Sequence, residues 1–163
     1  MARLLVVHHV PTETVRTLAD AVVAGTRDEA ISGVEVVVRP ALSATAEDVL
    51  GADGYLLGTP ANFGYMSGAL KHFFDSIFQQ AGGALGEDGS ATGAAGGRRR
   101  PYGLWVHGRY DTTGAVRSVE SIVGALPWVR SAPVLEVLGD LTAEHREAAY
   151  DLGGTIAALL GSD

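Results

Sequence analysis

Short apolar runs alternate with helix-like segments along almost the whole chain, and this alternation limits the folds that the sequence can adopt. The runs that indicate strands span residues 3–8, 34–39, 55–58, 102–107 and 134–138. Apolar residues recur at helical spacing between these runs, and the clearest stripe consists of Leu70, Phe73, Phe74 and Ile77. Strands that alternate with helices are typical of a parallel sheet covered on both faces. We therefore predict an α/β fold: a five-stranded parallel sheet with helices on both faces.

The chain has 163 residues, enough to bury one core, and we expect residues 1–163 to form a single domain. Hydrophobic residues make up 47% and charged residues 19%, which argues against disorder of the whole chain. Residues 80–100 differ, because they are almost entirely Gly, Ala, Ser and polar residues. Such a segment cannot bury much apolar surface, so we expect a flexible insertion there, with a mobile lid as the alternative.

Charge and composition exclude several classes of function. The net charge of −7 argues against nucleic-acid binding, and only Arg98, Arg99 and Arg100 form a basic cluster. The absence of cysteine excludes disulfides, cysteine–zinc sites and thiol nucleophiles. The apolar run at residues 1–7 is too short for a signal peptide or a membrane span, so we expect a soluble cytoplasmic protein with no membrane partner.

The histidines do not indicate a metal site. His8 and His9 are neighbours on a strand and therefore point to opposite faces. His9 and His107 are expected two strands apart, about 10 Å, which is too far to share one ion. We expect His8 to be a hydrogen-bonded residue of the core or of the strand end.

The topology of the predicted sheet indicates where a ligand would bind. Right-handed crossovers favour the strand order 2-1-3-4-5, and ligands bind beyond the carboxyl ends of the strands where the order reverses. The loops expected to meet there span residues 9–15, 59–66 and 108–114. In the middle loop, Pro60 stiffens the turn and Gly64 lets backbone approach a flat ligand. An ordinary strand-to-helix turn whose aromatic residues cap the core explains the same residues equally well.

One long segment makes the interpretation more specific. Residues 58–75, GTPANFGYMSGALKHFFD, resemble the GTP-x-x-x-G-x-M-x-G-x-x-K-x-F-x-D segment of NADPH-dependent FMN reductases. They are also similar to the corresponding segment of the tryptophan-repressor-binding-protein-type NAD(P)H:quinone oxidoreductases. With the strand pattern, the resemblance covers nearly the whole chain except about residues 79–100. It implies a flavodoxin-like fold, bound FMN, NADPH or NADH as electron donor, a small-molecule acceptor, and a homo-dimer or tetramer.

The resemblance also implies which residues contact the cofactor. The residues that would touch or flank the flavin ring from the middle loop are Pro60, Ala61, Asn62, Phe63, Gly64 and Met66. The residues that would line its other edge are His107, Gly108, Arg109 and Tyr110. The residues that would surround the phosphate are His9, Pro11, Thr12, Thr14 and Val15. Arg109 and Tyr110 are candidates for stabilising charge on the reduced ring or for binding substrate; the alternative is a solvated arginine and a loop-packing tyrosine.

The first loop departs from the family pattern, in which Ser or Thr hydroxyls and a Gly precede a helix whose amides and dipole stabilise the phosphate. Val10 stands where Ser is typical and Glu13 where Gly is common, although Thr12, Thr14 and Thr17 can supply hydroxyls. A carboxylate about 5 Å from a phosphate costs on the order of 3 kcal/mol per charge pair at an effective dielectric near 20. Unless Glu13 faces solvent or pairs with Arg16, the loop therefore indicates a weak or lost FMN site; we favour retention.

Three functional hypotheses follow from the sequence. The first is an FMN-dependent oxidoreductase that passes electrons from NAD(P)H to a quinone, a flavin or another small acceptor. The second is a flavodoxin-type electron carrier, which the acidic balance would suit for docking on a basic partner. The third is a non-catalytic protein that kept the fold but lost the cofactor. The fold by itself cannot choose among them.

Overall fold

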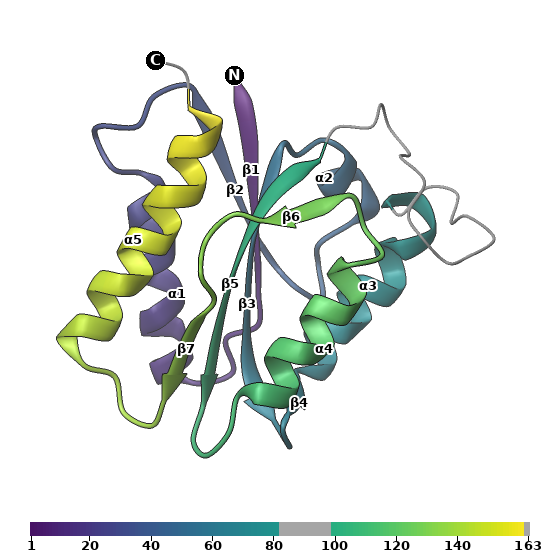
Figure 1. Cartoon of the computed structure of the whole chain (residues 1–163). Helices are drawn as coiled ribbons and strands as arrows, with labels where there is room; N and C mark the ends of the chain where they lie inside the picture. The colour runs from purple at the N-terminus through teal and green to yellow at the C-terminus, as the bar shows by residue number, and fades with distance from the viewer. Residues whose placement is uncertain (82–98, 162–163) are drawn as a thin grey trace.

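The computed structural model describes residues 1–81 and 99–161 and shows a central parallel sheet with helices on both faces (Figure 1). Its long strands are β1 (Ala2–His8), β2 (Val34–Pro40), β3 (Gly54–Asn62) and β5 (Arg100–Gly108). They lie in the order β2-β1-β3-β5, and each pairs with the next in parallel register. This arrangement confirms the predicted α/β sheet and the reversal of strand order between β1 and β3.

Two short strands occupy the fifth position of the sheet, where the sequence predicts one strand over residues 134–138. β6 (Trp128–Arg130) pairs with the beginning of β5, and β7 (Leu135–Leu138) pairs with its end. Pro133 lies between them and has no backbone N–H, so it cannot donate a hydrogen bond to the strand ladder. The position is therefore split, and both halves remain parallel to β5.

The third strand is longer than the predicted range of residues 55–58. It continues to Asn62, and its last residues pair antiparallel with the short strand β4 (Tyr65–Met66). The described part of the sheet thus contains seven strands rather than the predicted five. The extra length matters for the site, because it places a hairpin beyond the carboxyl edge of the sheet.

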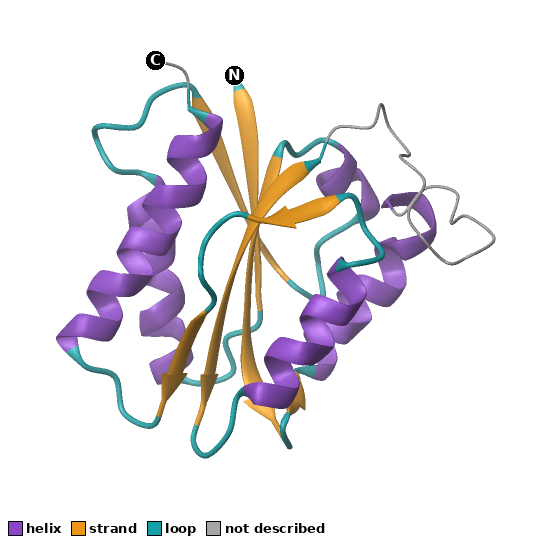
Figure 2. Ribbon diagram, in the orientation of Figure 1, coloured by secondary structure: helices purple, strands orange, loops and turns teal. Residues whose placement is uncertain are grey.

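The helices form two layers, one on each face of the sheet (Figure 2). One layer contains α1 (Glu13–Thr26) and α5 (Ala143–Leu160), and the other contains α2 (Ala46–Leu50), α3 (Gly68–Ala81) and α4 (Thr113–Val123). The predicted N-cap Ser67 is confirmed, since its Oγ accepts a hydrogen bond from the Leu70 N–H at 3.2 Å. Within residues 1–81 and 99–161, none of the helices is long and apolar enough to cross a membrane.

The predicted insertion at residues 80–100 has different ends in the structure. α3 continues to Ala81 and β5 begins at Arg100, so both ends of the range belong to regular elements. The segment between them, including the prediction of its flexibility, lies outside the described residues.

Alternation along the strands creates the two halves of the core. On β1, Leu5 and Val7 face α2, α3 and α4, whereas Leu4 and Val6 face α1 and α5. All four side chains are fully buried, which explains why this strand is almost continuously aliphatic.

The helices α1 and α5 pack unusually closely because glycines lie where they meet. A Cβ atom on Gly153 would lie 1.9 Å from the carbonyl oxygen of Val22, and one on Gly25 would lie 1.9 Å from that of Tyr150. Neither position can accept a side chain unless the helices separate. The neighbouring Gly154 is different, because its added Cβ would be no closer than 3.5 Å to the carbonyl oxygen of Gly25.

This contrast predicts opposite effects for two adjacent substitutions in α5. Gly153→Ala should destabilise the protein by about 1–3 kcal/mol, because the methyl group forces α5 away from α1. Gly154→Ala is the matched control and should be neutral or stabilising by up to about 1 kcal/mol, since alanine favours the helix. Urea unfolding followed by circular dichroism measures both. Equal effects of the two substitutions would contradict the close contact at Gly153.

Candidate functional site

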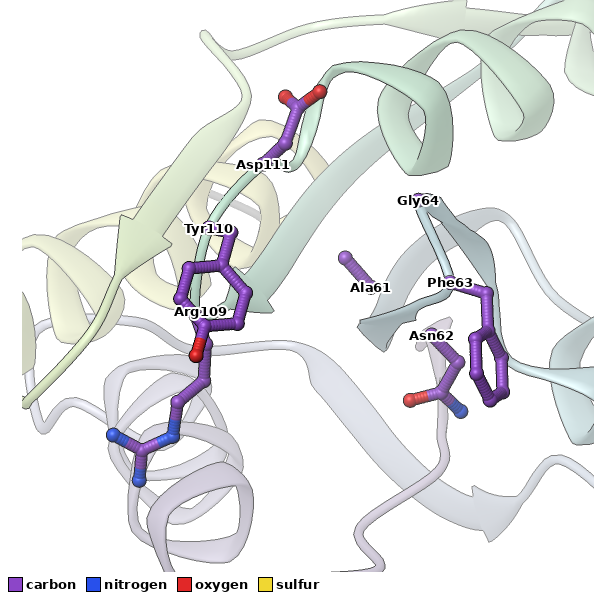
Figure 3. A pocket seen from close by; sticks show the side chains of 7 residues that line it. All are labelled: Ala61, Asn62, Phe63, Gly64, Arg109, Tyr110 and Asp111. Atoms are coloured by element: carbon purple, nitrogen blue, oxygen red, sulfur yellow. The ribbon is translucent and has the colours of Figure 1, made fainter.

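The loops that follow β1, β3 and β5 converge beyond the carboxyl edge of the sheet and enclose two connected grooves. The outer groove, of about 410 Å³, is lined by Ala61, Asn62, Phe63, Gly64, Arg109, Tyr110 and Asp111 (Figure 3). The α1 groove, of about 210 Å³, is lined by Pro11, Thr12, Thr14, Val15, Pro60, Ala61, Asn62, His107, Gly108 and Arg109. Because three lining residues are shared, the grooves form one continuous depression from the outer loops to the start of α1.

A tight turn between β3 and β4 forms one wall of the outer groove. Asn62 pairs with Tyr65, so only Phe63 and Gly64 form the turn, with φ angles of 52° and 73°. Positive φ at both central residues is the geometry of a type I′ turn, which normally favours Asn-Gly. Phenylalanine in this conformation costs roughly 1–2 kcal/mol, yet the Phe63 side chain is fully exposed and gains no packing in return. Strain of this kind is typical of functional sites.

Two exposed aromatic side chains stand on opposite sides of the outer groove. Figure 3 shows Phe63 on the hairpin side and Tyr110 on the loop after β5, with Ala61 between the two walls. Tyr110 is 93% exposed, so it too lies outside the core. A small side chain at the centre and aromatic surface at both edges suit a flat, partly apolar ring system.

A buried hydroxyl holds the base of the hairpin to the helix that follows it. Thr59 is fully buried; its Oγ1 accepts a hydrogen bond from the Ser67 N–H at 2.9 Å and donates one to the Pro60 carbonyl at 2.8 Å. This contact joins the end of β3 directly to the start of α3. The turn that carries Phe63 is therefore held at its base by a side chain that lines neither groove.

The end of β5 is held in a similar way by its own histidine. His107 is only 7% exposed, and its Nε2 lies 2.7 Å from the carbonyl oxygen of Gly139. Since a carbonyl only accepts, Nε2 carries a proton and donates it in this hydrogen bond. The backbone at Gly108 is closely packed, because an added Cβ would lie 3.2 Å from Ala61 Cβ and 3.1 Å from Thr112 Cγ2.

The start of α1 forms the inner end of the α1 groove. Thr12 caps the helix by accepting a hydrogen bond from the Val15 N–H at 3.4 Å. The Thr14 hydroxyl makes no hydrogen bond within the described residues, and the free N–H groups of the first turn create a positive partial charge. Glu13 is exposed and is not among the residues that line the groove, and it forms no ion pair with Arg16 within the described residues. Glu13 therefore faces solvent.

Two residues predicted to contact the cofactor lie outside both grooves. The β3–β4 pairing turns Met66 inward, where it is 2% exposed in the core beneath α3 and α4. His9 continues the pairing of β1, since its N–H donates to the Gly58 carbonyl at 3.2 Å. The other predicted contact residues line the depression: Pro11, Thr12, Thr14, Val15, Pro60, Ala61, Asn62, Phe63, Gly64, His107, Gly108, Arg109 and Tyr110.

Asp111 lines the outer groove and was not among the predicted contacts. Its carboxylate accepts a hydrogen bond from the Thr113 N–H at 2.9 Å, and this bond holds the pKa of Asp111 below its usual value. In the sequence, only its position inside the loop at residues 108–114 indicated that Asp111 could lie near a ligand. The residue places a negative charge at the rim of the outer groove.

One ring nitrogen of His8 lacks the hydrogen bond that we expected from the sequence. Its Nδ1 and the Trp105 Nε1 are both buried without a hydrogen-bond partner in the described structure. The strand register places them on either side of Gly58. Burial lowers the pKa of His8, and the nearby Arg16 lowers it further. Among residues 1–81 and 99–161, no group of three or more His, Cys, Asp or Glu side chains is arranged to hold a metal ion.

The half-buried imidazole of His8 predicts a loss of stability in mild acid. The pKa of His8 is lower in the folded protein than the usual 6.5. As the pH falls below about 6.5, the unfolded chain therefore binds more protons than the folded protein, and this lowers the free energy of unfolding. Between about pH 7.5 and 5.5 the wild type should therefore lose more free energy of unfolding than His8→Leu does. Urea unfolding of both proteins at the two pH values measures this difference. Parallel losses would show that His8 does not titrate differently in the two states.

The strained turn predicts that a polar substitution stabilises the protein. Phe63→Asn should raise the free energy of unfolding by about 1 kcal/mol, because asparagine tolerates positive φ and no packing is lost. Tyr110→Asn is the matched control: it removes an exposed aromatic residue at negative φ and should change stability by less than about 0.5 kcal/mol. A loss of stability in Phe63→Asn, measured by urea unfolding, would mean that the phenyl ring packs in solution.

Comparison with known proteins identifies the family and the fold of the chain. A family model described as NADPH-dependent FMN reductase matches residues 2–104. A curated flavodoxin from Aquifex aeolicus (strain VF5) is 35% identical over 98 residues, which are 60% of this chain and 52% of that protein. The chain thus spans about half the length of this curated relative.

Several solved structures have the same fold. A flavodoxin from the domain Archaea has a TM-score of 0.76 at 14% identity and covers 97% of this chain and 98% of its own. The oxidised Flavodoxin 1 from Bacillus cereus has a TM-score of 0.72 at 14% identity, over 95% and 97% of the two chains. The flavodoxin WrbA-like protein from Agrobacterium tumefaciens has a TM-score of 0.67 at 15% identity, over 98% of each chain. These likenesses confirm the predicted flavodoxin-like fold.

Proposed function

The chain belongs to the NADPH-dependent FMN reductase family, and from that premise we propose that it binds FMN and passes electrons from NAD(P)H to a small acceptor such as a quinone or a flavin. One observation carries the proposal. The two grooves are continuous, and together they join an open groove flanked by two aromatic side chains to the positive end of a helix.

The residues of the depression fit FMN in shape and in chemistry. The isoalloxazine ring suits the outer groove, where Ala61 leaves room between Phe63 and Tyr110. The sugar alcohol and phosphate suit the α1 groove, where the Thr14 hydroxyl and the free N–H groups of α1 are available. Each end of the cofactor would then meet groups of matching polarity.

The structure also bears on the two unusual residues of the first loop. Glu13 faces solvent and does not line the α1 groove, which lowers its repulsion of a bound phosphate. Val10 packs partly against the core beside α1, so it occupies no space in the groove. These placements support retention of FMN binding over its loss.

When FMN is bound, it supplies the hydride and electron transfer chemistry, and the protein supplies position and electrostatics. The exposed side chains of Phe63 and Tyr110 leave the outer groove open to solvent, so an electron donor and an acceptor can each approach the site. Tyr110 and Asp111 lie at the rim where such a molecule would arrive. Their positions suit contact with substrate.

The electron-carrier hypothesis is the second candidate. It is favoured by the curated relative named flavodoxin and by the net charge of −7, which suits docking on a basic partner. The carrier and the reductase share the FMN site and differ in what they do with NAD(P)H. Only the reductase oxidises NADPH or NADH continuously in the presence of a small acceptor.

Freshly purified protein should therefore be yellow or take up FMN, and it should oxidise NADPH or NADH steadily when a quinone or free FMN is added. Absorption spectra, FMN titration and the decay of nicotinamide absorbance measure these properties. FMN binding without steady oxidation would favour the electron carrier. A colourless protein that does not bind FMN at high micromolar concentration would overturn the proposal in both forms.

A substitution that fills the outer groove tests the location of the ring. Ala61→Leu should weaken FMN binding by about tenfold or more, because the larger side chain occupies the slot between Phe63 and Tyr110. Ala24→Leu adds the same atoms to an exposed position on α1 and serves as the control. Thermal unfolding confirms that both variants are folded. Unchanged affinity in Ala61→Leu would place the ring elsewhere.

A further inference from the structure

Arg109 lies at the junction of the two grooves and lines both of them. Figure 3 shows its side chain extending away from Phe63 and Asn62, toward the side on which α1 is drawn. The α1 groove brings Arg109 together with Thr12 and Thr14, so this direction agrees with the lining of that groove. Arg109 thus borders the inner end of the depression as well as the outer groove, whereas the resemblance implies that it borders the ring.

The α1 groove has the electrostatic character of an anion site. Arg109 carries the only permanent charge among the described residues that line it, and no carboxylate lines it. The opposite wall is the start of α1, whose N–H groups add positive partial charge. A dianionic group between these two walls would be attracted from both sides.

Arg109 is also available to a ligand. Within the described residues its one ion pair is with Asp140, at 3.6 Å, and the two side chains are 66% and 96% exposed. A contact of this length and exposure is weak and easily exchanged. A phosphate could therefore displace Asp140 without breaking a buried interaction.

We propose that Arg109 binds the terminal phosphate of FMN across the α1 groove and so determines the preference for FMN over riboflavin, which lacks that phosphate. This inference rests on the proposed function. It explains how a first loop containing Val10 and Glu13 can hold a phosphate: part of the charge comes from the loop after β5. Arg109 would then contact the phosphate end of FMN, and Tyr110, which lines only the outer groove, would remain beside the isoalloxazine ring.

Equilibrium titration with FMN and with riboflavin tests the assignment. Arg109→Gln should weaken FMN binding by about 10- to 100-fold, the range of a charge-assisted hydrogen bond, and should change riboflavin binding by less than about twofold. Arg109→Lys keeps the charge and should retain most of the preference for FMN. Arg117→Gln removes an exposed arginine of α4 that lines neither groove, and it should change neither affinity.

Removal of the competing carboxylate provides an independent readout. Asp140→Asn frees Arg109 and should leave FMN binding unchanged or tighten it by a few-fold, with riboflavin unaffected. Raising the salt concentration should weaken FMN binding to the wild type more than to Arg109→Gln, because the contact is partly exposed. Circular dichroism and thermal unfolding confirm that each variant is folded.

The outcomes separate this inference from the proposed function. Equal losses for both flavins in Arg109→Gln would place Arg109 at the ring, and no loss for either would show that it does not contact the cofactor. Either result would overturn the inference while FMN binding itself stood. Failure of the wild type to bind either flavin would overturn the inference and the proposed function together.

Discussion

His8, Gly58 and Trp105 lie in one row of paired residues across β1, β3 and β5. Parallel pairing in this register brings the carboxyl ends of the three strands to the same edge of the sheet. The loops that follow must then share one small region, although they are about 50 residues apart in the sequence. The grooves, the hairpin and the start of α1 all depend on this row. Gly58 is essential to it, because an added Cβ would lie 2.0 Å from the Trp105 ring.

Much of the fold could be predicted, because a strand that is buried on both faces appears in the sequence as a continuous apolar run. The strands β1, β2 and β5 and the cap at Ser67 follow from apolar runs and helical spacing. The split of the fifth position and the pairing of β4 could not be predicted, since very short strands leave almost no periodicity. For the same reason we predicted that Met66 would flank the flavin ring. The two-residue strand that contains Met66 instead turns its side chain into the core.

The position of the depression was predicted in outline, whereas several of its side-chain directions were not. Loop positions follow from topology, so the residues that line the depression were mostly anticipated. Side-chain direction does not follow from topology: Arg109 extends toward the side on which α1 is drawn in Figure 3, and the Nδ1 of His8 lacks a hydrogen-bond partner in the described structure. The positive φ of Phe63 also could not be predicted from the sequence, because only the hairpin register shows that Phe63 and Gly64 form the whole turn.

The divided fifth position of the sheet has a consequence for the behaviour of the protein at high concentration. A long, flat outermost strand exposes unpaired N–H and C=O groups to which other molecules can add by intermolecular sheet extension. Here that margin consists of strands of three and four residues separated by Pro133, whereas β2 on the opposite margin is a strand of seven residues. The divided margin offers no long template, so intermolecular sheet extension on the described sheet would have to use β2.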